Sequence, residues 1–404
     1  MSQRLALALS CVVSLAFLVS DAFAQGRQHR RTIIVNPVAG NPVRSGQRLL
    51  RSLSRAGGAS ATSPWLVKVE AGIYDVENTS VLMIPFVDLA GSGQGVTRIT
   101  GSPSGAAVVM GASDSELRDL TVEHRGGGSA GTALRNDEDG FSVHRVTAVA
   151  FDGANTGFAN NGHDTRVSEL TARVTGVPGG GSGVVNFGDR AEWKGVRAFI
   201  QGSGIVYAFF NYTDSNFTDI IAEAESSDAF AGAIRNEGGS PVMRDVRAFA
   251  KGTIGQAITN GASSNAQLYD VFARAIATTE RAHGINNEFG RPFLKNVDVR
   301  ADGATSAFGV ANLFGATVTM QEVNAVAIGG GTGAGLLTDG SHSIAQNSTF
   351  RGDGFSVDNR FDPAALSQLG ASQLDGAVNA GAGAVVCVSS YDGSFNPLTA
   401  TCTP

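Results

Sequence analysis

The stretch that decides the fold is Gly183-Val-Val-Asn186, which returns as Ala208-Phe-Phe-Asn211 and again as Ala233-Ile-Arg-Asn236. In each copy a small residue stands three positions before an asparagine. The pattern extends in both directions, and its other copies are Ala133-Leu-Arg-Asn136, Gly157-Phe-Ala-Asn160, Ala257-Ile-Thr-Asn260, Gly284-Ile-Asn-Asn287, Gly309-Val-Ala-Asn312 and Gly335-Leu-Leu-Thr338. The copies follow one another at intervals of 24 to 27 residues. A repeat of that length indicates a solenoid.

A second column of apolar residues runs between the asparagines. Each member is followed two positions later by a small apolar residue, mostly alanine, and this period of two is typical of a strand with one inner face. The column begins at Leu120, Val146, Leu170, Val196, Ile220, Val246, Val271, Val297 and Val323. The sequence therefore predicts an all-β right-handed parallel β-helix, with coils stacked about 4.8 Å apart. We interpret the asparagine column as structural, because stacked amides can bond along the axis.

Composition and charge exclude several classes of protein. Glycine numbers 53 of 404 residues without a three-residue period, and only 11 prolines are present, so the chain is not collagen. Residues 25–56 hold seven arginines and no acid. Residues 57–404 hold 22 Lys and Arg and 35 Asp and Glu, so they carry a net charge of −13. Such an acidic body excludes nucleic acid as the expected partner.

The first residues look like an export signal. Met1 to Arg4 form a basic start, Leu5 to Val19 an apolar run, and Ala22-Phe-Ala24 a cleavage site. The run is short for a spanning helix, and we expect no membrane span in the mature chain. We therefore expect a secreted or periplasmic protein. Removal of the signal leaves Cys387 and Cys402, which we expect to form a disulfide.

Both ends of the stack need covers, because a solenoid exposes two sheet edges. A helix from Ser45, its expected N-cap, to Ala56 would bury its leucines and expose a face of arginines, and Gly57 would follow its end. We read this face as solvated, although it could instead dock on an anionic surface. The expected regions are the signal peptide (1–24), a basic leader with the cap helix (25–59), the β-helix (60–360) and a C-terminal cap with the disulfide (361–404).

The first candidate site is a row of aspartates at intervals of 25 residues. Its members are Asp139, Asp164, Asp189 and Asp214. Stacked coils would bring neighbouring carboxylates within about 5 Å, where each pair repels by about 1 kcal/mol even in water. Ca²⁺ prefers oxygen ligands at this density, so the row is a candidate calcium site. The alternative is four separate turn residues that point outward beside arginines.

The second candidate site is a stripe of outward strand positions with arginines beside phenylalanines. Its members are Arg197, Phe199, Arg247, Phe249, Phe272 and Arg274. Exposed aromatic rings and guanidinium groups can stack on sugar rings and bond acidic groups, so the stripe is a candidate ligand surface. A covering loop or a contact between molecules would explain the same residues.

Two segments at the start of the solenoid carry a resemblance to a known family. They are Pro64-Trp-Leu-Val-Lys-Val-Glu-Ala-Gly-Ile-Tyr74 and Val87-Asp-Leu-Ala-Gly-Ser-Gly-Gln-Gly-Val-Thr-Arg-Ile99. They resemble the opening coils of pectin-lyase-like proteins, and the later coils and the closing cysteines are similar to secreted bacterial β-helix proteins of unassigned activity. The resemblance implies the fold for roughly residues 60–404. It implies little about function, because one fold hosts many activities.

The catalytic signatures of that superfamily do not map onto this chain. The pectate-lyase Trp-x-Asp-His pattern is absent, and Gly162-His-Asp164 only partly matches the polygalacturonase Gly-His-Gly. We therefore expect a protein that binds carbohydrate or a surface component without catalysis. The alternative that stays open is a polysaccharide lyase or glycoside hydrolase acting on a polysaccharide, with or without uronate, in which the aspartate row and its arginines would hold the site.

Overall fold

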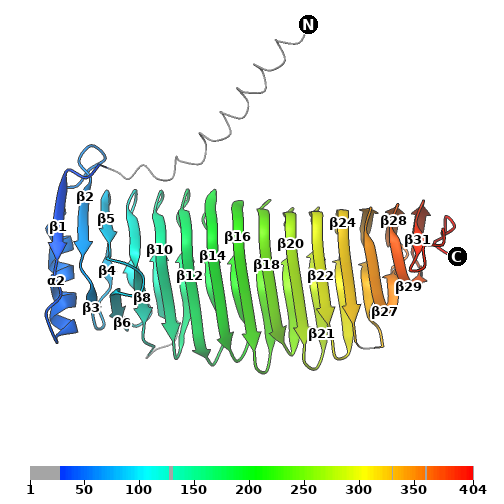
Figure 1. The fold of residues 1–404 in the computed structure, drawn as a ribbon, viewed down its shortest axis with the longest axis horizontal. Coiled ribbons are helices and arrows are strands. Elements are labelled where there is room, and N and C mark those ends of the chain that lie inside the picture. The colour runs from blue at the N-terminus through cyan, green and yellow to red at the C-terminus, as the bar shows by residue number, and fades with distance from the viewer. Residues whose placement is uncertain (1–27, 127–130, 330, 360–361, 404) are drawn as a thin grey trace, which may run out of the picture.

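The computed structural model of the chain describes residues 28–126, 131–329, 331–359 and 362–403. These residues form a rod in which strands stack side by side from one end to the other (Figure 1). The ladders between successive coils are parallel, so the predicted all-β parallel β-helix is confirmed. The expected signal peptide, residues 1–24, lies outside the described residues.

The first coils combine short strands with the single helix of the described residues. Their elements are β1 (Arg31–Val35), α2 (Pro42–Ser54), β2 (Trp65–Val69), β3 (Gly72–Asp75), β4 (Val81–Leu82), β5 (Val87–Ala90), β6 (Thr97–Gly101), β7 (Ala107–Met110) and β8 (Glu116–His124).

One face of the rod is a sheet of short strands, and each has a residue of the asparagine column at its last or next-to-last position. These strands are β9 (Gly131–Asn136), β11 (Ala154–Asn160), β13 (Gly181–Asn186), β15 (Val206–Asn211), β17 (Phe230–Asn236), β19 (Ile254–Asn260), β21 (Arg281–Glu288), β23 (Ser306–Leu313) and β25 (Ala334–Asp339). They pair with one another in coil order, and the asparagines stay in register.

Long strands alternate with the short ones. They are β10 (Ser142–Phe151), β12 (Arg166–Val177), β14 (Ala191–Gly202), β16 (Ser215–Ser226), β18 (Val242–Gly252), β20 (Gln267–Ala277), β22 (Phe293–Asp302) and β24 (Thr317–Ile328). Each bends at one residue with a positive φ, for example Asp219 at 56° in β16 and Asp245 at 55° in β18. The bend turns the strand around a corner, so each long strand contributes to two faces of the rod.

The core is narrow and lined by small side chains. The column Ala148, Ala172, Ala198, Ala222 and Ala248 is in register, and each member is at most 2% exposed.

The widest side chains gather in the coils of β11 to β16. Trp193 is buried there between the rings of Phe158, Phe209 and Phe217, at centroid distances of 5.7, 5.0 and 6.4 Å. This aromatic layer fills a section of the core that alanines alone would leave open.

The asparagine column forms a buried ladder of amides, as predicted. Asn136 Nδ2 donates to Asn160 Oδ1 at 2.8 Å, and Asn160 Nδ2 donates to Asn186 Oδ1 at 2.7 Å. Asn160 Nδ2 also donates to the Gly162 carbonyl of its own turn at 3.0 Å. The ladder therefore joins coils along the axis and satisfies the backbone of the turns.

The cap helix α2 differs from its expected start. It begins at Pro42, and Asn41 is the N-cap, whose side chain accepts from the Arg44 N–H. Proline suits the first helical position and asparagine the cap, so these two residues set the boundary. Ser45, the expected cap, is buried, and its hydroxyl accepts from the Val38 N–H and donates to the Asn41 carbonyl.

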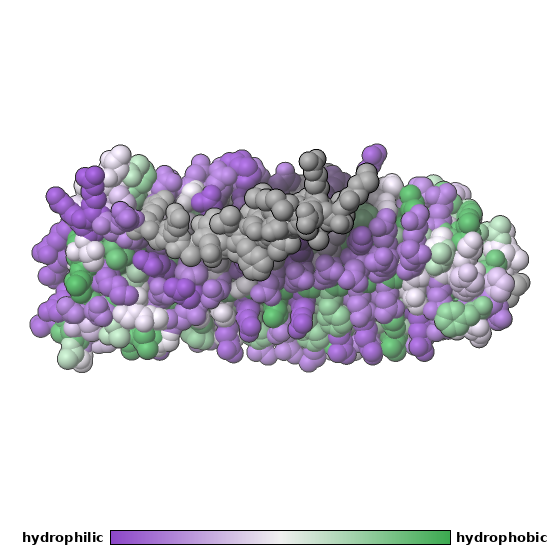
Figure 2. Space-filling view, turned by 45° about the horizontal axis from the view of Figure 1, so that its top comes forward, coloured by the Kyte–Doolittle hydropathy of each residue, from purple (hydrophilic) through white to green (hydrophobic). Residues whose placement is uncertain are grey.

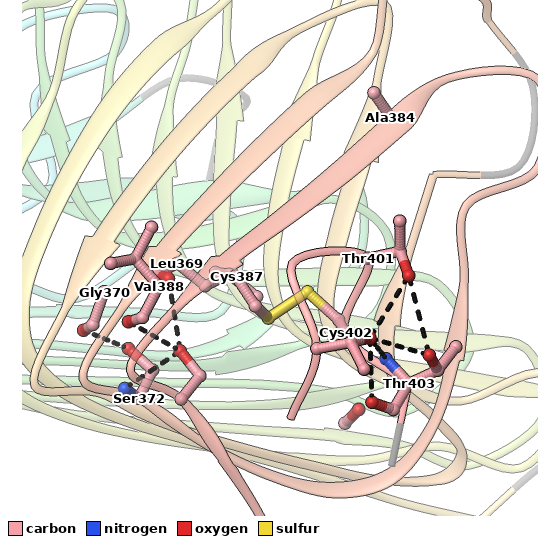
Figure 3. Close-up of a disulfide and its surroundings, with 12 residues drawn as sticks. Leu369, Gly370, Ser372, Ala384, Cys387, Val388, Thr401, Cys402 and Thr403 are labelled. Atoms are coloured by element: carbon pink, nitrogen blue, oxygen red, sulfur yellow. Dashed lines mark hydrogen bonds between the residues drawn. A yellow bond between two sulfur atoms is a disulfide. The ribbon is translucent and has the colours of Figure 1, made fainter. Parts of the chain in front are cut away.

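The C-terminal strands complete the stack. They are β26 (His342–Gln346), β27 (Thr349–Asp358), β28 (Leu366–Gly370), β29 (Gln373–Asn379), β30 (Ala384–Val388) and β31 (Tyr391–Asp392). The predicted disulfide between Cys387 in β30 and Cys402 is confirmed, with Cα atoms 5.2 Å apart (Figure 3). The Cys387 N–H donates to the Ala400 carbonyl, so the final turn covers part of β30.

Strand pairing extends beyond the boundaries expected at 60 and 360. At one end β1 pairs with β2, and at the other β28 pairs with β30. Both extensions bury apolar residues such as Val35 and Leu369 that have no asparagine column beside them. The face shown in Figure 2 is mainly hydrophilic with short hydrophobic rows. Within the described residues, no helix has the length and apolar character needed to cross a membrane.

Candidate functional site

The four aspartates of the expected calcium site do not stack in one column. His163 lies between Asp139 and Asp189, because its N–H donates to Asp139 Oδ1 at 2.8 Å and its Nδ1 accepts from the Asp189 N–H at 3.1 Å. The strands that follow these turns advance by 24, 26 and 24 residues per coil, so a constant spacing of 25 does not keep the register. The spacing of 25 residues therefore does not by itself place the four carboxylates in a single ladder, and calcium binding by these aspartates stays a prediction.

Side chains of Arg190 and His163 lie between the aspartates instead. Arg190 donates from Nε and Nη2 to the two carboxylate oxygens of Asp164, both at 2.7 Å. These hydrogen bonds lower the pKa of Asp164 below its usual value. His163 Nδ1 accepts from the Asp189 N–H at 3.1 Å. Among the residues that the structure describes, no group of three or more His, Cys, Asp or Glu side chains is placed to hold a metal ion.

An open depression lies beside this pair. It has a volume of about 400 Å³, and the residues lining it are Asp164, Arg166, Arg190, Glu192, Asp214, Ser215, Asn216 and Ser240. Both charge signs are present, and Arg166 lies 3.9 Å from Glu192. The depression is thus a polar surface in which Asp164 and Glu192 face arginines of the chain.

The predicted arginine and phenylalanine stripe lies on the second half of the long strands. Alternation points its six residues outward, but they do not form one continuous aromatic surface. Glu223 lies in register between Phe199 and Phe249. The guanidinium of Arg173 lies 5.4 Å from the Phe199 ring centroid, and Arg274 forms an ion pair with Asp302 at 3.2 Å. The stripe is a flat surface of charged residues with isolated rings.

A continuous aromatic surface lies on the other face, beside the asparagine ladder. Phe187 follows β13, Phe210 lies in β15 and Tyr212 follows β15. The Tyr212 ring stacks on Phe187 with centroids 4.3 Å apart and on Phe210 with centroids 4.6 Å apart, each at 19°. Phe187 and Tyr212 are 47% and 40% exposed. We call these three residues the aromatic platform.

Hydrogen-bonding groups border the aromatic platform. The guanidinium of Arg235 lies 5.7 Å from the ring centroids of Tyr207 and Phe210, and Arg235 Nη1 donates to Tyr207 Oη at 3.2 Å. Arg235 also forms an ion pair with Glu237. Burial raises the pKa of Tyr207 above its usual value, so its hydroxyl stays protonated at neutral pH. Rings and fixed polar groups therefore lie together on one surface.

The platform could have been found from the sequence. Its residues flank the asparagine column, as Asn186-Phe187 and Phe210-Asn211-Tyr212. Since the ladder asparagine points inward, the residues on either side of it must point outward. Aromatic residues next to an inward-pointing asparagine are the sequence signal for this surface.

Comparisons with known proteins give no family. No family model matches the chain, and no curated protein matches it in sequence. The A-module of the mannuronan C-5 epimerase AlgE4 of Azotobacter vinelandii is 12% identical with a TM-score of 0.41, over 89% of this chain and 96% of that one.

Two further solved structures are similar at the same level. The catalytic domain of a GH87 alpha-1,3-glucanase in complex with tetrasaccharides is 12% identical with a TM-score of 0.48, over 81% of this chain and 66% of that one. Tailspike protein 3 of bacteriophage CBA120 is 10% identical with a TM-score of 0.44, over 97% of this chain and 70% of that one. Likenesses at these values do not bear on function. The parallel β-helix that the sequence resemblance implied is confirmed by the strand ladder itself.

Proposed function

We propose that this chain is an exported carbohydrate-binding protein whose ligand stacks on the aromatic platform. The observation that supports this function is the continuous stack of Phe187, Tyr212 and Phe210, with two of its rings exposed to solvent. A pyranose ring offers flat C–H faces that pack on aromatic rings, and hydroxyls at its edges that need hydrogen bonds. The platform supplies the aromatic rings, and Arg235, Glu237 and Tyr207 supply hydrogen-bonding groups.

The charge around the platform favours a neutral hexose polymer. Arg235, the cation beside the platform rings, is paired with Glu237, so this pair adds no excess of positive charge. The body of the protein is acidic, with a net charge of −13 over residues 57–404. A uronate polymer would be repelled by that body unless a local cluster of cations offset it.

Catalysis has less support. A glycoside hydrolase needs a carboxylic acid with a raised pKa beside a second carboxylate. In the depression beside Arg190, the hydrogen bonds from that guanidinium lower the pKa of Asp164 instead. A lyase that used Arg190 as its base would first have to break the two hydrogen bonds to Asp164. The lyase or hydrolase alternative therefore ranks second.

Binding to insoluble and soluble polysaccharides tests the proposal. Tyr212→Ala removes the middle ring of the platform, and we expect about tenfold weaker binding of a neutral glucan, which corresponds to about 1.4 kcal/mol. Phe199→Ala on the stripe is the matched control and should bind like the parent. A loss in the Phe199→Ala variant alone would transfer the site to the stripe. Preferential binding of polygalacturonate over glucans would contradict the assignment to neutral polymers.

A further inference from the structure

The turns that follow the asparagine column form one row along the rod, and we call this row the ridge. A second pair of exposed rings lies on the ridge, further along the rod than the aromatic platform. Phe289 and Phe314 stack with centroids 5.5 Å apart at 24°, and they are 49% and 57% exposed. Each follows its ladder asparagine, Asn287 or Asn312, by two positions. The Phe289 N–H donates to the Leu313 carbonyl, and the Phe314 N–H to the Asp339 carbonyl, so the backbone of both turns is held in place.

Both phenylalanines have a backbone conformation that bulky residues avoid. Their φ values are 59° and 57°, in the left-handed region that suits glycine or asparagine. The next residues, Gly290 and Gly315, also have positive φ, so the turns already use glycine where it is needed. Because the two rings are half-exposed, core packing does not explain why phenylalanine stands at either position. Strained, exposed residues of this kind collect at ligand sites.

The distance between the two aromatic pairs suits a polymer that runs along the rod. The ridge passes from the turn after β15 to the turn after β21 in three coil steps, through β17 and β19. At about 4.8 Å for each step, Tyr212 of the platform and Phe289 of the second pair lie about 14 Å apart along the axis.

The ridge between the pairs carries mostly small residues beside Glu237. Gly238, Gly239 and Gly261 lie there and have no side chain, while Glu237 directly follows the ladder residue Asn236. A Cβ at Gly261 would lie 2.4 Å from a carboxylate oxygen of Glu237, so no larger residue fits at that position without displacing Glu237. A chain bound to both pairs would thus pass the Glu237 carboxylate, which can accept hydrogen bonds from its hydroxyls.

We infer that Phe289 and Phe314 form a second stacking site, and that a glycan lies parallel to the solenoid axis across both aromatic pairs. This inference rests on the proposed function of the aromatic platform. Binding at two linked sites makes the second contact intramolecular, so affinity rises with ligand length once the ligand covers the gap of about 14 Å. Short ligands gain nothing from the second site.

The test compares ligand lengths in a variant that lacks both rings. Phe289→Gly combined with Phe314→Gly keeps the left-handed backbone, and calorimetric titration would use cello-, laminari- and malto-oligosaccharides from dimers to octamers. For the parent we expect the octamer of the bound series to bind at least about tenfold more tightly than the dimer. For the variant we expect that gain to disappear, while dimers still bind to the aromatic platform.

A stability measurement separates binding from a structural role. Since glycine relieves the strained backbone, we expect the melting temperature of the variant to rise by about 1–2 °C for each substitution. Phe395→Gly is the matched control, because Phe395 has φ 64° and is 73% exposed in the C-terminal turn, far from the ridge. It should gain the same stability and keep the full length dependence.

The outcomes for the two proposals can be told apart. If the double variant keeps the length dependence of the parent while Tyr212→Ala weakens every ligand, the second site is overturned and the proposed function stands. A parent that binds no oligosaccharide of any length overturns both. A double variant that melts below the parent would show that the two rings stabilise the fold, and it would remove the strain argument for the second site.

Discussion

Asn160 offers a sharp test of the amide ladder, because an ordinary surface asparagine stands next to it. Asn160 is fully buried and takes part in four hydrogen bonds. In Asn160→Ala, Asn186 Oδ1 loses the only donor the described residues give it, which costs about 1–3 kcal/mol for a buried acceptor. Loss of the bonds to Asn136 and to the Gly162 carbonyl adds about 1 kcal/mol each. We expect the free energy of unfolding to fall by about 4 kcal/mol.

The control for this variant is Asn161→Ala. Asn161 makes one exposed hydrogen bond, from Nδ2 to Asp137 Oδ1 at 2.6 Å, so its removal should cost less than about 1 kcal/mol. Urea unfolding under non-reducing conditions measures both variants, and with a slope of about 3 kcal/mol/M the Asn160→Ala midpoint should fall by about 1 M. Equal midpoints for the two variants would refute the idea that the ladder stabilises the solenoid.

An isosteric change separates shape from hydrogen bonding. Asn160→Asp keeps the size of the side chain but cannot donate to Asn186 Oδ1 when it is ionised. Burial should raise the pKa of the new carboxyl, so the folded state would bind more protons than the unfolded state, and stability should fall as pH rises above about 4. If the difference in free energy of unfolding between the variant and the parent does not change between pH 4 and 7, this account is contradicted.

Three further predictions concern the disulfide, calcium and pH. Unfolded, unreduced protein should show no titratable thiol, and two thiols in an Ellman assay would contradict the bridge. Calcium binding at the aspartate row stays a prediction: a melting temperature that rises with millimolar calcium in the parent but not in Asp164→Asn/Asp189→Asn would establish it, and an unchanged parent would exclude it. Burial, and secondarily Arg281, lowers the pKa of His283 to about 4, so the unfolded state binds the extra proton between pH 6.5 and 4. Stability should therefore fall by up to about 3 kcal/mol as pH drops through that window, and His283→Gln should flatten the fall.

The fold could be predicted because the repeat constrains it many times over. The asparagine column and the alanine column recur in every central coil, so a local irregularity at one position does not obscure the pattern. The disulfide followed from export and from a single remaining pair of cysteines. The helix has its cap at Asn41, four residues before the expected cap Ser45, because asparagine followed by proline is a stronger start signal than serine.

The aspartate row shows why the site was harder to predict than the fold. A difference of one residue in coil length leaves a strand recognisable but moves a surface side chain to the neighbouring column. The carboxylate of Asp164 thus meets the Arg190 guanidinium, and only the backbone N–H of Asp164 reaches Asp189, at its carbonyl. Only the register between strands fixes such a neighbour, and the register depends on turn lengths that sequence spacing gives only on average.

The aromatic layer around Trp193 gives the protein a built-in optical probe. The chain holds two tryptophans, and the indole of Trp193 is dry and surrounded by phenylalanine rings, so it should emit at short wavelength. Trp65 is half-buried in the first coils with the Arg31 guanidinium 4.9 Å from its ring, and its emission should lie further to the red. The blue and the red sides of the tryptophan emission spectrum therefore report on different sections of the rod. Unfolding that starts at the N-terminal coils would change the red side of the emission before the blue side.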